Sequence, residues 1–540
     1  MRSTFSGFNA PVSGLFAAQR AMDVVGHNLS NIDTDGFTRQ RSNQAASFPT
    51  YDGRSGWIGT GVRMRFITQI RDELLDARYR EKYSKMQYWT ETSASLRNME
   101  NIFGEPSEKA ITDIINNFYG AIDNILKNPT NNTARSQFIN TAITFTNYFN
   151  DMSEKLNKTI QDLDKDAVAM VTDLNSMLHQ VAVLNKQIFI DESDGSMAND
   201  LRDKRNLLVD QISKLVNVKA SKTIIKDNQG RPREHFQLTI DGHVAVLHDD
   251  VFEVKIGEKV PTDLYKMARN RKNSTTGADE PSTDAMGLTV TRFEFYDGER
   301  LSMNRVGGML GATLQQRDSV GDPKMNNAVR GVPYYIRALN EYMRTFTDEA
   351  NRIHKQGFDA NGDPGIDLFV SYELDPDSGV PSLINSKNVR VNPIVINSIK
   401  KLAIGLENSL DGKPSESDTG NFHRFFKMKE TKLSIDFKVA VAGVPHDINL
   451  GQGTPEDVIK SLITSILGVD AKEANDTLHN SEVEELELNM LRMSVSGVSE
   501  NEELTNMLKF QHAYNASARM ITTVDEMLDV IINRMGRVGL

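Results

Sequence analysis

The chain has 540 residues and a formal net charge of −11, from 62 basic and 73 acidic side chains. This length exceeds what a single hydrophobic core usually serves, so we expect several domains. The acidic balance gives no uniform attraction to phosphate and argues against a general nucleic-acid binder. The chain has no cysteine, which excludes disulfides, a cysteine nucleophile and thiolate metal sites.

The first thirty residues carry an apolar seam with alternating steps of three and four. Its members are Leu15, Ala18, Met22, Val25 and Leu29. This alternation predicts a helix with one apolar face. Turn-forming residues follow it, so the helix is expected to end near residue 30 or 31. Polar residues interrupt these first thirty residues, so we expect no cleaved secretory signal. Nowhere in the chain do we expect a stretch long and apolar enough to span a membrane.

The middle of the chain changes its periodicity several times. Helical spacing from about Asp72 to Ile190, with turns at 103–106 and 127–129, predicts antiparallel helices, and another helix is expected to end at Leu215. A period of two over 216–305 predicts an inserted β domain. Helical spacing returns over 332–353 and 455–493, with a strand expected over 433–441 between them.

A second seam runs through the last part of the chain in the same alternation. It consists of Met507, Phe510, Tyr514, Ser517, Ile521, Val524, Leu528, Ile531 and Met535. An ordinary core helix would also carry such a stripe. Because both ends of the chain carry matching seams with polar outer faces, we expect the two terminal helices to pair as a coiled coil.

Together these patterns predict an α+β, multidomain fold. It has paired terminal helices, a discontinuous, mainly helical domain and an inserted β domain. The expected domains are 1–70 with 500–540 for assembly; 71–215 with 306–408 and 454–499 for the helical domain; 216–305 for the β insertion; and 409–453 for an uncertain strand-containing insertion.

Two short motifs resemble those of the axial proteins of the bacterial flagellum, the rod, hook and hook-associated proteins. The N-terminal motif consists of Asn28, Ser30, Asn31, Thr34, Gly36, Phe37, Arg39 and Gln40. The C-terminal motif consists of Ser496, Gly497, Val498, Ser499, Glu502, Glu503, Gln511 and Tyr514, and is similar to that of the hook-associated proteins of the hook-filament junction. The resemblance covers both ends and the helical core, but not the middle.

The resemblance implies a structural protein of the flagellum, outside the cell, exported without a cleaved signal peptide. It implies self-assembly into a ring or short tube. Its neighbours would be the hook protein and a further hook-associated protein, and an export chaperone would bind it; no nucleic acid and no membrane insertion are implied. The expected assembly interface consists of Leu15, Met22, Val25, Leu29, Phe510, Tyr514, Ile521, Val524, Leu528 and Ile531.

The sequence offers little chemistry for catalysis, and we predict no catalytic, cofactor or metal site. The segment Asp359–Asp363 spaces oxygen ligands like the start of a calcium loop, but Val370 stands where that loop needs glutamate. A turn is therefore favoured over a calcium site. His243 and His248, beside Asp249, are interpreted as surface residues of a strand pair.

We therefore expect a structural subunit at the hook-filament junction, needed for filament assembly and motility, and not an enzyme. One alternative is another axial component, such as hook or distal rod. The other is an enzyme or adhesin that the β insertion carries on a flagellar scaffold. Deletion of 216–305 would reveal it, because filaments would persist while that activity was lost.

Overall fold

A computed structural model describes most of the chain, and every structural statement concerns that part. The described residues are 6–52, 56–104, 110–226, 232–261, 268–272, 279–283, 289–321, 329–372, 382–406, 417–441, 444–530 and 532.

Helices make up most of the described chain. They are α1 (Ser6–Ser30), α2 (Glu73–Gly104), α3 (Ala110–Lys127), α4 (Asn132–Asp191), α5 (Asn199–Leu215), α6 (Gly308–Asp318), α7 (Val332–Lys355), α8 (Pro393–Asn397), α9 (Gly420–Lys427), α10 (Pro455–Lys460), α11 (Gly468–Ser496) and α12 (Glu500–Asp529). Short 3-10 segments η1 (Glu192–Asp194), η2 (Ile399–Lys401) and η3 (Met428–Glu430) and a π-helical segment η4 (Ser461–Leu467) accompany them.

The strands form small antiparallel sheets. They are β1 (Gln40–Ala46), β2 (Thr50–Asp52), β3 (Gly56–Ile58), β4 (Val62–Gln69), β5 (Val218–Lys226), β6 (Pro232–Ile240), β7 (His243–Leu247), β8 (Asp250–Val251), β9 (Lys255–Pro261), β10 (Ala268–Lys272), β11 (Asp279–Thr283), β12 (Thr289–Glu294), β13 (Phe369–Ser371), β14 (Val389–Val391), β15 (Leu433–Val441) and β16 (Val444–Gly453). Only β5-β6-β7-β8 form a described sheet of four strands; the others are pairs.

The chain divides into two compact units. Unit 1 consists of Met1–Met86, Asp173–Val254 and Ser481–Leu540, and unit 2 of Gln87–Thr172 and Lys255–Asn480. These cuts differ from the domain boundaries expected from the sequence, which stay a prediction.

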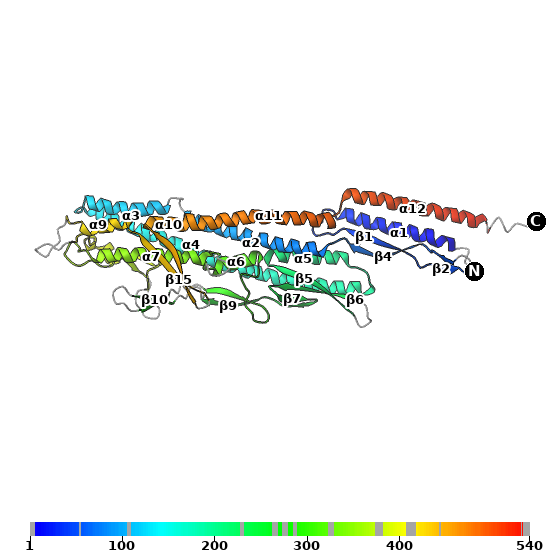
Figure 1. The fold of residues 1–540 in the computed structure, drawn as a ribbon, viewed down its shortest axis with the longest axis horizontal. Coiled ribbons are helices and arrows are strands. Elements are labelled where there is room, and N and C mark those ends of the chain that lie inside the picture. The colour runs from blue at the N-terminus through cyan, green and yellow to red at the C-terminus, as the bar shows by residue number, and fades with distance from the viewer. Residues whose placement is uncertain are drawn as a thin grey trace, which may run out of the picture. The chain divides into compact units, whose positions relative to one another are not determined.

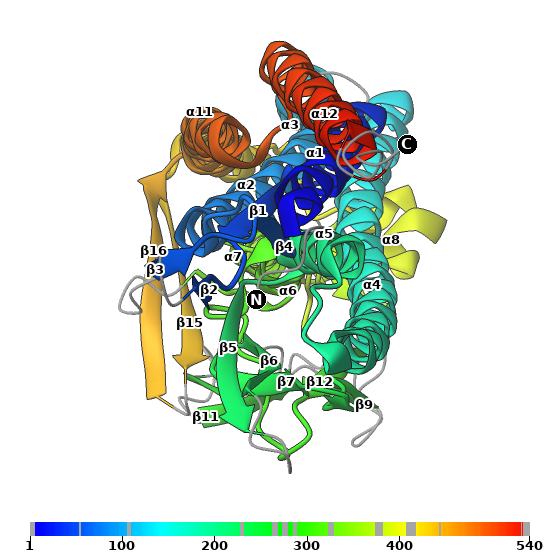
Figure 2. The ribbon, with the colours of Figure 1, turned by 90° about the vertical axis from the view of Figure 1, so that its right-hand side faces the viewer.

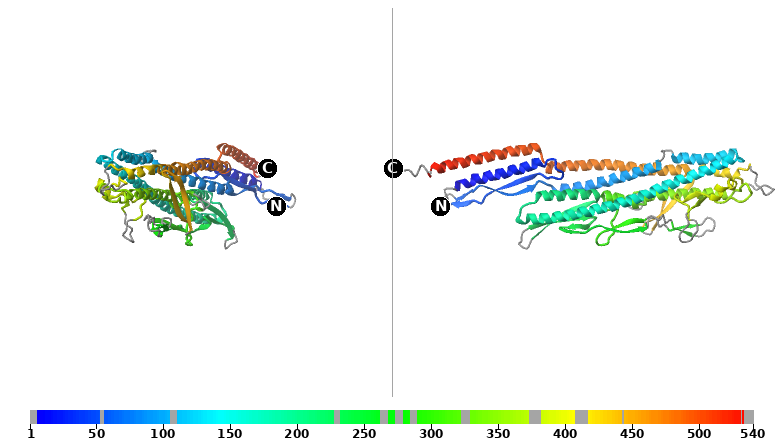
Figure 3. Two further views of the ribbon diagram at one scale, coloured as in Figure 1. Left: turned by 60° about the vertical axis from the view of Figure 1, so that its left-hand side comes forward. Right: turned by 180° about the vertical axis from the view of Figure 1, so that it is seen from behind.

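In unit 1, α1 lies between α12 and the strands β1 and β4 (Figures 1 and 2). The views of Figure 3 agree that α1 and α12 run side by side. Strand β1 pairs with β4 from Gln40↔Gln69 to Ala46↔Val62. The side-chain amide of Asn185 on α4 donates to the carbonyl of His248, 2.7 Å away, and so ties the four-stranded sheet to this helix.

Unit 2 has an aromatic core contributed by α3, α4, α7 and α9. The Phe118 ring lies at its centre, fully buried, with ring centroids 5.2–6.4 Å away. Those neighbouring rings are Phe138, Phe145, Phe346, Phe369 and Phe425. Burial of so many aromatic side chains supplies this unit's main stabilisation.

Most of the predicted elements are confirmed, including the helix that ends at Ser30, the antiparallel helices, the strands within 216–305 and strand β15. The strands of 40–69 were not predicted. Strand β1 is polar and lacks a period of two, and contact with α1 helps to hold it. In β4, Val62, Met64 and Phe66 alternate with arginines, which is a strand signal that was missed.

The expectation that no stretch is long and apolar enough to span a membrane is wrong, because one described helix meets both criteria. Helix α4 contains an 18-residue window with a mean hydropathy of 1.2. One such helix is weak evidence for a membrane span, because core helices of soluble proteins pass the same test. Phe138, Phe145, Phe149 and Leu156 of α4 are fully buried in the core of unit 2.

Candidate assembly site

The seam of α12 faces α1 in the structure. From Met507 to Leu528 every predicted seam position is half-buried or buried, and nearly all positions between them are exposed. In α1, Leu15, Met22 and Leu29 are half-buried, and Val25 is buried. Ile531 and Met535 lie outside the described residues. The role of these side chains in assembly stays a prediction.

The sequence pattern missed a second buried stripe of α1. Ala17, Ala21 and Val24 are buried beside the predicted seam. A Cβ atom added to Gly14 would lie 3.0 Å from the Oγ atom of Ser517 on α12, so the two helices approach closely there. Small side chains at helical spacing could have signalled this approach, but alanine is also common in any helix.

The N-terminal motif closes back on the end of α1 through Asn28. The side-chain amide of the fully buried Asn28 donates to the Gln40 carbonyl at 2.9 Å, and its Oδ1 accepts from the Gln40 N–H at 3.0 Å. Gln40 also donates to Asp200 on α5, 2.9 Å away. Asn31 donates to the His27 carbonyl at 2.9 Å and so ends the helix. Asparagine at these positions therefore shapes the turn.

The other motif residues complete the turn. Ser30 donates to the Gly26 carbonyl at 2.9 Å, and Thr34 donates to the Asn31 side chain at 3.2 Å. The ring of Phe37 packs edge-on against the imidazole of His27, with a centroid distance of 5.4 Å.

The two terminal motifs meet at Arg39. Its Nε donates to Oε1 of Glu503 at 2.7 Å, and its Nη1 donates to Oε2 of Glu502 at 2.6 Å. The second Glu503 oxygen accepts from Asn28 at 3.2 Å, and the Arg39 N–H donates to the Ser496 carbonyl at 2.9 Å. Burial lowers the pKa of Arg39, but its bonds and charge attraction to the two carboxylates outweigh this and leave the pKa raised.

The C-terminal motif forms the break between α11 and α12. A Cβ atom on Gly497 would lie 2.5 Å from the Met493 carbonyl oxygen, so only glycine fits there. Ser499 is the N-cap of α12, and its carbonyl accepts from the Glu503 N–H at 3.0 Å. Val498 is half-buried, while Gln511 is exposed on α12 away from this cluster.

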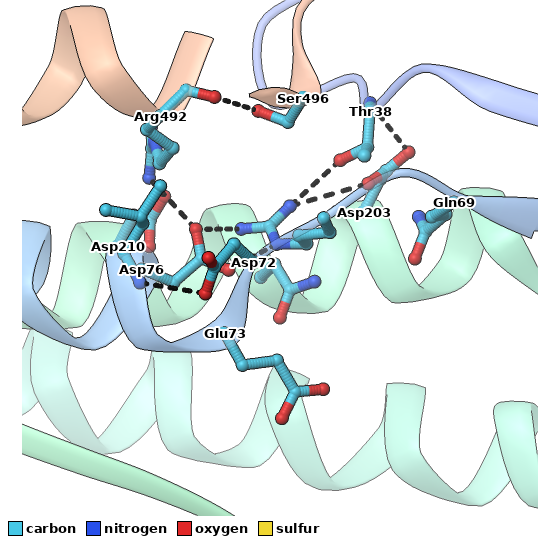
Figure 4. Close-up of polar contacts among 12 residues, drawn as sticks. Thr38, Gln69, Asp72, Glu73, Asp76, Asp203, Asp210, Arg492 and Ser496 are labelled. Carbon is cyan, nitrogen blue, oxygen red and sulfur yellow. Dashed lines mark hydrogen bonds and ion pairs between the residues drawn. The ribbon is translucent and has the colours of Figure 1, made fainter. Parts of the chain in front are cut away.

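A polar network lies under the two motifs, around the start of α2 (Figure 4). Arg71 binds Asp76 at 2.5 Å, and Asp210 on α5 accepts from Arg80 at 2.6 Å and from Arg492 on α11 at 2.7 Å. Three segments distant in sequence therefore meet through charged side chains. A cleft of about 300 Å³ beside this network is lined by residues of both motifs, including Gly36 and Gly497.

Asp203 is a buried carboxyl group beside this network. It accepts from the Thr38 N–H at 3.1 Å (Figure 4), and Arg71 lies 3.7 Å from its other oxygen. Burial raises the pKa of Asp203 to about 6, although the bonds from Thr38 and the charge of Arg71 lower it. The desolvation of this buried carboxylate outweighs its partners.

We expect Asp203→Asn to raise the free energy of unfolding at pH 7.5 by about 2 kcal/mol, with no gain at pH 4. The folded-state pKa lies above the ordinary 3.8, so the native state prefers the protonated carboxyl group. The ionised form therefore costs stability above about pH 6, and this cost fades as the pH falls toward 4. Denaturant unfolding at both pH values measures the difference, with the exposed Asp33→Asn as control. A loss of stability at pH 7.5 would show that Arg71 dominates instead.

Gly36 occupies a conformation that favours glycine, with a φ of +77°. An added Cβ atom would also lie 3.0 Å from Cβ of Leu207. We expect Gly36→Ala to lower the free energy of unfolding by about 1–2 kcal/mol, measured by denaturant titration. Gly26→Ala in α1 is the matched control, because nothing lies within 4 Å of its Cβ position, and it should be neutral or stabilising. Equal losses in both variants would refute the role of Gly36.

The candidate calcium turn holds a lysine ammonium group in front of its carboxylates. The Lys401 Nζ lies 2.8 Å from Asp359 and 2.7 Å from Asp363. Oδ1 of Asp359 accepts from the N–H groups of Asn361 and Asp363, as in an ordinary turn. The chain's own lysine thus supplies the positive charge that a cation would bring.

His235 of β6 and His248, which follows β7, stack on each other. The imidazole of His248 stacks on His235, with centroids 4.3 Å apart, and packs edge-on against Phe189. His248 is therefore part of an aromatic cluster.

Known protein families match both ends of the chain and its helical part. Residues 8–38 match the family described as flagella basal body rod protein, and 492–535 match the flagellar basal body rod FlgEFG protein C-terminal family. These matches contain most of the two motifs that meet at Arg39, and they define an axial protein of the bacterial flagellum. Residues 96–369 match the flagellar hook-associated protein FlgK helical domain, which spans about half of the chain. The chain belongs to the flagellar hook-associated protein FlgK family.

Relatives match over nearly the whole length. The flagellar hook-associated protein 1 of Bacillus subtilis is 28% identical over 545 residues, covering 99% of each chain. That of Escherichia coli K12 is 22% identical over 590 residues, covering 97% of this chain and 99% of the relative. The solved flagellar hook junction protein FlgK from Burkholderia pseudomallei gives a TM-score of 0.40 at 19% identity, covering 56% of this chain and 47% of the other.

Proposed function

We propose that the chain is a structural, non-catalytic subunit at the hook-filament junction of the flagellum, needed for filament assembly and motility. The observation that supports this most is the joining of the two ends at Glu503. This carboxylate binds both Arg39 and Asn28. Asn28 lies 475 residues before Glu503 in the chain. Family membership and the full-length relatives support the same role.

In this proposal α1 and α12 of each copy pair as a coiled coil and then pack with neighbouring copies. Other apolar side chains of α12 are available for that packing. Leu504, Leu508, Met520 and Met527 are 44–60% exposed. Burial of these side chains between copies would offset the entropy lost on assembly.

The copies would form a ring or short tube. Hook protein would lie on one side and a further hook-associated protein on the other. Export would proceed without a cleaved signal peptide and with the help of a chaperone. These partners follow from family likeness.

Electron cryotomography of flagella that carry a tagged copy tests the position. The proposal expects density for the tag in a single short zone between hook and filament. Density along the whole hook or within the rod would instead favour another axial component.

A further inference from the structure

Residues 40–69 form an arm of two hairpins, β1–β4 and β2–β3, with large aromatic side chains in the solvent. Phe48 is 74%, Tyr51 62% and Trp57 71% exposed. Tyr51 and Trp57 face each other across the hairpin, with ring centroids 5.3 Å apart. A two-stranded hairpin is marginal in water, and clustered exposed aromatic residues mark an interaction site.

The same arm presents arginines beside the aromatic rings. The register pairs Arg41 with Thr68, Asn43 with Phe66 and Ala45 with Arg63, so these residues share one face of β1–β4. Gln40 and Gln44 on the opposite face bond to other parts of unit 1, Gln44 to the Ala17 carbonyl of α1. The guanidinium carbon of Arg63 lies 4.3 Å from the centre of the Phe48 ring.

We call this outward surface the arm face. It consists of Arg41, Phe48, Tyr51, Trp57, Arg63 and Phe66, all of them exposed. Arginine and large aromatic residues are the types most enriched at the energetic centres of protein interfaces.

A complementary surface lies on the last turns of α11, within the same unit. Val483, Leu486, Met490 and Met493 follow one another in steps of three, four and three, and each is 52–59% exposed. Glu482 and Glu487, also exposed, flank this stripe. We call these six residues the α11 face.

We infer that the arm face of one copy docks on the α11 face of a second copy. The charges are complementary, because Arg41 and Arg63 would meet Glu482 and Glu487 while the rings pack on leucine and methionine. Methionine side chains adapt readily to aromatic surfaces. This inference rests on the proposed function, which places copies of the chain side by side.

The exposed apolar side chains of α12 fit the arm less well, because they do not form one stripe. On a helix with about 3.6 residues per turn, Leu504 and Leu508 lie on one flank and Met520 and Met527 on the other. The four apolar side chains of the α11 face instead share one side of their helix, between two acidic residues. This arrangement favours α11 as the surface that the arm binds.

A charge exchange tests the contact in a deletion strain complemented with variants. Arg41→Glu with Arg63→Glu, and Glu482→Lys with Glu487→Lys, should each lower the fraction of cells with filaments at least tenfold. All four changes together should restore most of it. Each purified variant should keep the thermal unfolding of the wild type, because the side chains are exposed. Normal filaments from both double variants, or failure of the fourfold variant to restore them, would overturn the inference.

Cross-linking tests the same contact directly, because the chain has no cysteine. One copy carries Trp57→Cys and the other Leu486→Cys, both expressed together, and isolated flagella are treated with a short bismaleimide. We expect covalent dimers of this chain from the mixture and none from either variant alone. A product that joins Trp57→Cys to a different protein would overturn the proposed occupant.

Separate outcomes would refute the contact and the proposed function. If wild-type complementation restores filaments but the mixture gives no dimers, the contact is refuted and the proposed function stands. If the deletion strain has normal filaments from the start, the proposed function itself fails.

Discussion

Replacing Ile521 and Leu528 together by aspartate is expected to abolish filament formation while unit 2 stays folded. Both side chains lie on the face of α12 that packs against α1, and Leu528 is only 8% exposed. A carboxylate placed there loses its hydration without gaining a partner, at a cost of several kcal/mol. The pairing of the terminal helices should therefore be lost. Electron microscopy of a complemented deletion strain measures the result.

The matched control places the same two charges on the outer side of α12. Asn515 and Thr522 are both exposed, so Asn515→Asp with Thr522→Asp should leave α12 paired with α1. Circular dichroism and thermal unfolding of the purified proteins report whether unit 2 remains intact. Normal filaments from the Ile521 and Leu528 variant would refute the assignment of the seam.

Glu503→Ala is expected to lower the free energy of unfolding of unit 1 by about 3 kcal/mol. Glu503 is 2% exposed and is bound by Arg39 and Asn28. Its removal leaves the half-buried guanidinium group of Arg39 with only the exposed Glu502 as partner and takes one acceptor from the buried Asn28 amide, and such losses are costly. Hydrogen exchange of α1 and α12, together with denaturant unfolding, measures the loss.

Glu502→Ala is the matched control, because Glu502 binds the same arginine at 2.6 Å but is 62% exposed. An exposed ion pair contributes about 0–1 kcal/mol, so this variant should remain close to the wild type. Glu503→Gln, which keeps an acceptor for Arg39 and Asn28, should fall between the two. Equal losses from Glu502→Ala and Glu503→Ala would contradict the importance of burial in this cluster.

Periodicity predicted the helices well because the spacing of apolar residues within a few turns determines each apolar face. The 3,4 alternation of α12 identified the face that packs on α1, and turn chemistry located the end of α1 at Ser30. The close approach at Gly14 and the stripe of Ala17 and Ala21 were missed, because small residues carry no strong apolar signal.

The polar contacts around Glu503 and Asp203 could not be predicted from the spacing of residues in the sequence. The partners of Glu503 and Asp203 come from segments more than 130 residues away, so only the fold brings them together. The resemblance of the two motifs to one protein family singled out Asn28, Arg39 and Glu503. It did not reveal that Arg39 and Asn28 bind Glu503 directly.

Deletion of the gene in its host tests the central claim most directly. Flagella are then viewed by electron microscopy, and the growth medium is assayed for filament subunits. A structural subunit at the hook-filament junction predicts hooks without filaments and filament subunits shed into the medium, with both defects reversed by the wild-type gene. Intact filaments and normal motility in the deletion strain would contradict it.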